Sequence, residues 1–146
     1  MAVQYLSLTH LLVANEALDQ TCCGSEWELF WRVAALAAER DLVNGTGEAL
    51  AWAHGSRAEL HLLRAIRPDP QQSADQALAH ARSLLQLVDR ESFVAYSTGR
   101  QFTRYAEWWA QPLSANPNAK LDTKGLAVQI ANLFPKARTF SHEKEW

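Results

Sequence analysis

Four basic residues follow one another at helical spacing in the segment between residues 47 and 67. They are His54, Arg57, His61 and Arg64, at positions i, i+3, i+7 and i+10, so a helix places them in one stripe about three turns long. Because the other faces of this helix carry mostly apolar side chains, we expect the stripe to be its exposed face. Such a stripe is either a plain solvated surface or a contact for an acidic or phosphate-bearing partner. Binding to such a partner would strengthen below about pH 6.5, as the histidines gain protons.

The spacing of the two histidines argues against a metal site. Two turns separate His54 from His61, which is roughly 10 Å by helix rise and too far for both rings to bind one zinc ion. The two cysteines, Cys22 and Cys23, are adjacent and indicate a reducing compartment. No zinc-protease motif, Gly-rich phosphate loop or nucleophile elbow occurs. The sequence therefore predicts no metal, no cofactor and no catalytic residue, and an enzyme is the less favoured class.

A second group of residues suited to binding lies in residues 93–109, FVAYSTGRQFTRYAEWW. Part of this segment follows the spacing of a core-facing helical stripe, namely Val94, Thr98, Phe102, Tyr105 and Trp109. The residues left over, above all Trp108 with Arg100 and Arg104, are of the types enriched at binding hot spots. We therefore expect Arg100, Arg104, Trp108 and Trp109 to contact a protein partner or a second copy of the chain. Stacking on nucleic-acid bases is the weaker alternative.

One carboxylate stands out because it lies on an otherwise apolar side of its predicted helix. Glu59 is expected to be a buried partner for an arginine or a tryptophan indole N–H, and a functional acid is the alternative. A pocket lined by Trp27, Trp31, Trp52 and Tyr105, with Glu59 or a histidine as its polar group, would make a small-molecule or catalytic site. A filled core with an exposed apolar patch would instead favour an interaction protein.

The elements that position these residues are predicted from hydrophobic periodicity and from the residues that begin and end helices. The expected helices run over residues 3–18, 25–44, 47–67, 73–88, 92–110 and, from about residue 122, a shorter one that Pro135 ends. Ser25 with Glu28, and Ser73 with Gln76, match the capping box that starts a helix. With no strand pattern and with short links, the sequence predicts an all-α domain of five to six helices, arranged as antiparallel hairpins or a bundle.

Composition narrows the class of protein further. The 146 residues are 48% hydrophobic and 21% charged, which is typical of a single globular domain, here with residues 134–146 expected as a mobile tail. The formal net charge of −2 argues against general nucleic-acid binding. The N-terminus lacks a basic region and polar residues interrupt its apolar run. We therefore expect no signal peptide, no membrane span and a cytoplasmic location.

The segment RAELHLLRAIRPDP, residues 57–70, resembles the second helix of a tetratricopeptide repeat. Ala58, Leu62, Ala65 and Pro70 fall at the small, large, small and proline positions of that family. The family's first-helix signature of Trp, Leu-Gly and Tyr is not met upstream. The resemblance implies stacked helical hairpins that bind other proteins and carry no chemistry of their own. We therefore expect a non-enzymatic interaction module or a small subunit of a larger assembly, with a protein partner, an acidic one at the histidine–arginine stripe, or a second copy of the chain.

Overall fold

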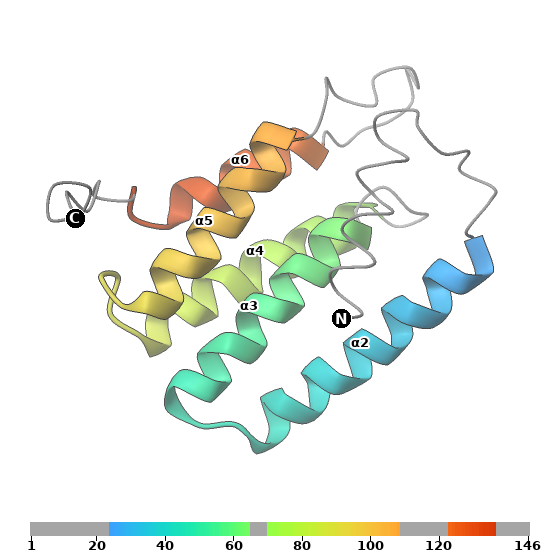
Figure 1. The fold of residues 1–146 in the computed structure, drawn as a ribbon, viewed down its shortest axis with the longest axis horizontal. Helices are drawn as coiled ribbons and strands as arrows, with labels where there is room; N and C mark the ends of the chain where they lie inside the picture. The colour runs from blue at the N-terminus through green and yellow to red at the C-terminus, as the bar shows by residue number, and fades with distance from the viewer. Residues whose placement is uncertain (1–23, 65–69, 109–122, 137–146) are drawn as a thin grey trace, which may run out of the picture.

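The computed structural model describes residues 24–64, 70–108 and 123–136, which form five α-helices and no strand (Figure 1). The helices are α2 (Gly24–Asn44), α3 (Gly47–Arg64), α4 (Pro70–Leu87), α5 (Phe93–Trp108) and α6 (Thr123–Leu133). The predicted all-α fold of five to six helices is confirmed. The helix predicted over residues 3–18, the loop predicted over residues 111–121 and the capping side chain of Ser25 lie outside the described part. None of the described helices is long and apolar enough to cross a membrane.

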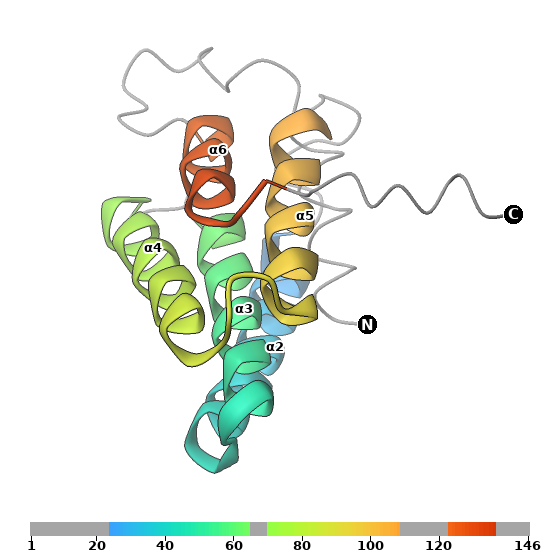
Figure 2. The same ribbon diagram turned by 90° about the vertical axis from the view of Figure 1, so that its left-hand side faces the viewer.

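Helix α3 lies at the centre of the described helices. It packs most extensively against α4 and next against α2, and it also contacts α5 and α6, while α5 packs mainly on α6 (Figures 1 and 2). Figure 2 shows α4 and α5 on the two sides of α3, with α6 above it. Helix α2 runs along the edge of the bundle and packs chiefly on α3. The links before and after α3 are short, so α2, α3 and α4 pack as neighbouring antiparallel helices, as in helical hairpins.

The core forms where apolar stripes of the helices meet. Its buried members include the predicted stripe of α5, namely Val94, Thr98, Phe102 and Tyr105, and also Trp31, Ala34 and Ala38 of α2, Ala77, Ala81 and Leu84 of α4, and Leu126, Ile130 and Phe134 at α6. Alanines line the faces of α2 and α4, while larger side chains fill the space around α5 and α6. Small residues let helices approach closely, so the packing of α2 and α4 on α3 follows from their alanine content.

A helical glycine permits the contact between α5 and the end of α6. A Cβ at Gly99 would lie 2.7 Å from the Cβ of Phe134, closer than unbonded carbons approach, so a side chain at Gly99 is incompatible with this packing. Phe134 is buried, and its ring stacks on Phe102 with centroids 6.3 Å apart. The tail expected over residues 134–146 therefore begins after Phe134, and residues 137–146 lie outside the described part.

The predicted start of α4 is wrong by three residues. The structure begins α4 at Pro70, so Ser73 is a buried residue inside the helix and does not form the predicted capping box with Gln76. Proline is favoured in the first turn of a helix because its missing N–H is not needed there. At α5, Ser92 acts as the cap, since the Ala95 N–H donates a hydrogen bond to its Oγ at 3.2 Å.

Two glycines shape the link between α2 and α3. The Gly45 N–H donates a hydrogen bond to the Asp41 carbonyl at 2.8 Å, which closes the last turn of α2 at the predicted position. Gly47 has a φ of 57°, in the left-handed region where glycine carries no steric penalty. The chain reverses here, so α3 returns along the face of α2 that carries Trp31.

Candidate functional site

The stripe of His54, Arg57, His61 and Arg64 is not the exposed face of α3. His61 is only 9% exposed, and the other three residues are half-buried. Helix α2 covers the stripe from one side and α4 from the other, as the contacts described below show. The prediction of an exposed basic face is therefore wrong. The periodicity of α3 identifies one polar stripe, but it does not say which helices pack upon it.

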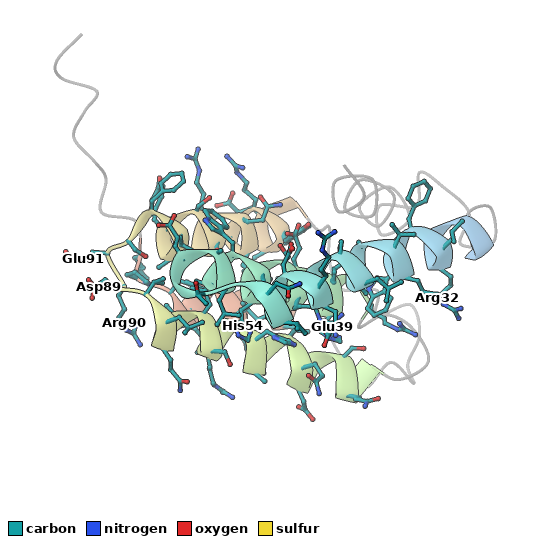
Figure 3. The ribbon with its side chains drawn as sticks, turned by 90° about the horizontal axis from the view of Figure 1, so that it is seen from below. Arg32, Glu39, His54, Asp89, Arg90 and Glu91 are labelled. Carbon is teal, nitrogen blue, oxygen red and sulfur yellow. The ribbon has the colours of Figure 1, made fainter. Side chains whose placement is uncertain are left out.

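Three histidine rings lie together between α3 and α4, and we call His54, His61 and His80 the histidine cluster. The Nδ1 atoms of His54 and His80 are 2.9 Å apart, so one ring donates a hydrogen bond to the other. The ring of His61 stacks on that of His80, with centroids 5.7 Å apart and planes 8° from parallel. Because one proton lies between the two Nδ1 atoms, at most one ring of the His54–His80 pair is fully protonated in this geometry. His54 on α3 and Glu39 on α2 are labelled in Figure 3, which views the bundle from below.

His80 is not among the residues predicted from the sequence. It lies on α4, three residues after the buried Ala77 and four residues before the buried Leu84, which places it beside the core stripe of its helix. This spacing is the signal that identifies His80 as an inward-facing polar residue. The sequence of α4 alone does not indicate which residue of α3 would contact His80.

Burial and basic neighbours keep the histidine cluster uncharged at neutral pH. Burial is the main cause that lowers the pKa of His61 to about 4, with further lowering by Arg57, His80 and Arg64. Burial, followed by His54 and Arg57, lowers the pKa of His80 to about 4. Burial also lowers the pKa of His54. Near pH 7 the positive charge of this region therefore resides on the two arginines.

Several buried nitrogen atoms in this region have no hydrogen-bond partner from the described residues. They are Nε of Arg57 and both ring nitrogens of His61. Glu39 of α2 faces Arg57, with 4.0 Å between Arg57 Nη2 and Glu39 Oε2, and the Glu39 side chain is 59% exposed. A buried donor without an acceptor costs about 1–3 kcal/mol, and more when it is charged. Among the residues that the structure describes, no acceptor or donor satisfies these buried nitrogen atoms.

Trp31 of α2 closes the other side of the histidine cluster. Its indole N–H donates a hydrogen bond to the Leu60 carbonyl of α3 at 2.9 Å. Its ring meets the His61 ring edge to face, with centroids 6.1 Å apart and planes at 67°. The Arg64 guanidinium lies 4.1 Å from the Trp31 ring centroid, within cation–π range. Trp31 therefore fixes α2 to the C-terminal half of α3 and holds Arg64 in place.

The described residues do not bring the tryptophans of the predicted pocket together. Trp31 contacts His61, whereas Trp52 contacts Phe93 of α5, with ring centroids 6.2 Å apart. These two contact points on α3 are nine residues apart, which is roughly 13 Å along the helix. The Trp27 side chain lies outside the described part. Trp31 and Trp52 thus pack at separate places on α3.

Glu59 is half-buried and faces α5. The Tyr105 hydroxyl donates a hydrogen bond to its carboxylate, and Gln101 Nε2 donates a second one at 3.4 Å. The donors described here are a phenol and an amide, because α5 packs on the side of α3 that carries Glu59. Tyr105 is fully buried, so this pair fixes α5 against α3.

The binding residues predicted on α5 are described only in part. Arg100 is exposed and Arg104 is half-buried, both on the surface side of α5. The side chain of Trp108 and all of Trp109 lie outside the described part. The predicted core stripe of the same helix is confirmed, as reported above. The division of α5 into a buried stripe and a surface that carries arginines therefore holds for the side chains described.

Helix α2 exposes a row of apolar side chains that sequence analysis missed. Leu29 is 62% exposed, Val33 52%, Leu36 71% and Val43 76%. We call these four residues the α2 outer seam, because they point away from the face of α2 that packs on α3. Their intervals of four, three and seven residues are those of a coiled-coil heptad. This heptad spacing could have identified the seam from the sequence. It was overlooked because α2 has two apolar faces, and the face that carries Trp31 already accounts for its packing in the core.

Comparison with known proteins identifies no relative of this chain. No protein-family model, no curated protein and no solved structure matches it. Within the described residues, no three side chains among His, Cys, Asp and Glu are grouped so that they could hold a metal ion. The surfaces and clusters described above are therefore the basis for a functional proposal.

Proposed function

We propose that this protein is a cytoplasmic, non-enzymatic interaction module that associates with a second copy of itself through the α2 outer seam. The observation that carries the proposal is the exposure of Leu29, Val33, Leu36 and Val43, each more than half exposed and all on one line of α2. Contiguous exposed apolar patches on soluble proteins commonly mark interaction sites. The core beneath α2 is formed by the opposite face of this helix. The seam residues are therefore not needed for the core, which supports a role for them in binding.

A second copy fits the α2 outer seam in the antiparallel orientation. The d positions of the heptad are Leu29, Leu36 and Val43, and the a positions are Val33 and Arg40. In a parallel pair, Arg40 would face the partner's Arg40 inside the seam, which brings like charges together. In an antiparallel pair, Val33 packs against the partner's Leu36, and Arg32 comes beside the partner's Glu39. Arg32 and Glu39 are both exposed and lie on the same side of α2 (Figure 3).

The size of the seam sets the expected strength of association. Complete burial of a Val or Leu side chain contributes about 1.5–3 kcal/mol, so the part-exposed seams of two copies contribute roughly 8–16 kcal/mol together. Association costs about 4–15 kcal/mol in lost freedom of motion and in ordering of side chains. The two ranges overlap, so we expect a dimer whose formation depends on concentration, not a permanent one.

The tetratricopeptide-like segment agrees with this class of protein. Ala58 and Leu62, two of the residues that carry the resemblance, are fully buried on α3. Helix α3 packs in hairpins with α2 and α4, and helix hairpins are what such repeats stack to present binding surfaces. We propose that the fold supplies a rigid platform for binding rather than a catalytic pocket.

Light scattering after size exclusion tests the proposal over a range of protein concentrations. We expect the wild-type mass to rise toward that of a dimer, and Leu36→Glu to remain monomeric with an unchanged circular dichroism spectrum. Leu87→Glu on α4 is the matched control, because Leu87 is an exposed leucine outside the seam, at 39%. A wild type that stays monomeric, or a Leu36→Glu variant that still dimerises, would overturn the proposal. The proposal would also be overturned if the wild type is monomeric and Leu36→Glu unfolds it. That result would mean that other residues of the same chain cover the seam.

A further inference from the structure

A group of basic side chains is enclosed where α2, α3 and α4 meet. Arg57 and Arg64 come from α3 together with His54 and His61, and His80 comes from α4. The charged neighbours that act on His61 and His80 are all basic. We propose that Arg57, His61 and His80 form a binding site for a compact oxyanion of the phosphate class, which enters beside Glu39. This site is separate from the α2 outer seam and does not depend on self-association.

The buried donors give the site its chemistry. His61 is about nine-tenths buried, and neither of its ring nitrogens has a hydrogen-bond partner among the described residues. Nε of Arg57 is buried and without a partner in the same way. A guanidinium presents several N–H donors in one plane, which suits the oxygens of phosphate or sulfate. An oxyanion that contacts Arg57 and His61 would satisfy both at once.

The sign of the surrounding charge selects an anion over a cation. Arg57 lowers the pKa of both His61 and His80, so its positive charge acts on both rings. The same charge opposes a metal ion placed among them. An anion has the opposite effect, because it raises the histidine pKa values and binds with uptake of a proton. Its affinity should therefore increase as the pH falls toward the pKa of the histidines.

Glu39 shows where the anion would enter. Its carboxylate lies 4.0 Å from Arg57 Nη2, at the outer limit of an ion pair, and its side chain is mostly exposed. Glu39 is labelled in Figure 3, which views the bundle from below. A small rotation of this exposed side chain would free Arg57 for an incoming oxyanion. Glu39 then acts as a competitor, and its removal should strengthen anion binding.

Isothermal titration calorimetry of the full chain tests the site with sodium phosphate and sodium sulfate at constant ionic strength. Sulfate does not titrate between pH 5.5 and 7.5, so the pH dependence of its affinity reports the protein. We expect sulfate to bind several-fold more tightly at pH 5.5 than at pH 7.5, with proton uptake seen as a dependence of the heat on the buffer. O-phosphoserine is tested beside phosphate, and the preferred ligand shows whether the site takes a free ion or a phosphate monoester.

Paired variants give effects of opposite sign. Arg57→Gln should weaken binding at least tenfold, Glu39→Gln should tighten it several-fold, and Arg100→Gln, at an exposed arginine of α5, should leave it unchanged. If Arg57→Gln does not fold, Arg57→Lys replaces it and should still weaken binding. The proposal is overturned by absence of binding, or by an Arg57 variant that binds as the wild type does. Repeating the titrations in Leu36→Glu separates anion binding from self-association.

Discussion

The Nδ1 atoms of His54 on α3 and His80 on α4 are 2.9 Å apart, so the two helices with the most extensive contact are also joined by a histidine–histidine hydrogen bond. This bond requires that one ring lack a proton on Nδ1. His61 stacks on the same His80 ring from two helix turns further along α3. The interface of α3 and α4 therefore depends on the protonation of histidines that the packing itself keeps neutral.

We expect the free energy of unfolding to fall when the pH is lowered from about 6.5 to about 4. The pKa of His61 and that of His80 are lowered from 6.5 to about 4 in the folded protein. Above pH 6.5 both states carry neutral rings. Between the two values the unfolded chain takes up protons that the folded protein does not, so stability decreases with falling pH. Urea denaturation at pH 7.5, 6.5, 5.5 and 4.5 measures this change.

The control for the acid effect is His61→Leu, which removes one of the two titrating rings. Its stability should depend less steeply on pH between 6.5 and 4.5 than that of the wild type, because carboxylates contribute equally to both. A His61→Leu variant with the same pH dependence as the wild type would show that the acid effect arises elsewhere in the chain.

Gly99→Ala should destabilise the protein, although alanine is the better helix former. The new Cβ would lie 2.7 Å from the Cβ of Phe134, and overpacking of this kind costs about 1–3 kcal/mol. At an unhindered helical position the same change would stabilise by about 0.5–1 kcal/mol, so the sign of the effect is diagnostic. The midpoint of urea unfolding measures it, with Ser97→Ala on the same helix as control. A Gly99→Ala variant more stable than the wild type would contradict the packing of α5 on Phe134.

Tyr105→Phe should cost about 1–3 kcal/mol of stability, because it removes the hydroxyl that donates to Glu59 and leaves a part-buried carboxylate with one donor fewer. A double-mutant cycle with Glu59→Gln measures the coupling between the two side chains. We expect the double variant to be less destabilised than the sum of the single variants. Strict additivity of the two changes would mean that the hydrogen bond contributes nothing to the fold.

Local periodicity was sufficient to predict the five described helices and the buried stripe of α5. The stripe Val94, Thr98, Phe102 and Tyr105 on α5 is buried as predicted, because a helix repeats every 3.6 residues whatever it packs against. The predicted start of α4 is wrong because Ser73 and Gln76 match a capping box, whereas the helix begins at Pro70, and proline is favoured at that position. Boundary errors of this kind leave the core stripe unchanged.

Contacts between helices were not predictable in the same way. The stripe of His54 and His61 has the pattern of a surface, and its burial depends on α4 bringing His80 alongside it. A pairing of residues 26 positions apart depends on the tertiary packing and leaves no mark on either helix alone. The α2 outer seam was missed for the opposite reason. Helix α2 carries two apolar faces, and the one with Trp31 already explained its hydrophobic residues.

The orientation of the proposed dimer can be tested by disulfide cross-linking in a Cys22→Ser, Cys23→Ser background, which removes both native thiols. In the antiparallel pair, Val33 faces the partner's Leu36, so a mixture of the Val33→Cys and Leu36→Cys variants should form a disulfide-linked dimer on oxidation. Each variant alone should remain largely unlinked, because residues at the same position lie in different layers of an antiparallel seam. In a parallel pair each position faces itself, and each variant would link to its own copy. Non-reducing gel electrophoresis and mass spectrometry distinguish the two patterns, and efficient linking of the single variants would contradict the antiparallel arrangement while leaving self-association intact.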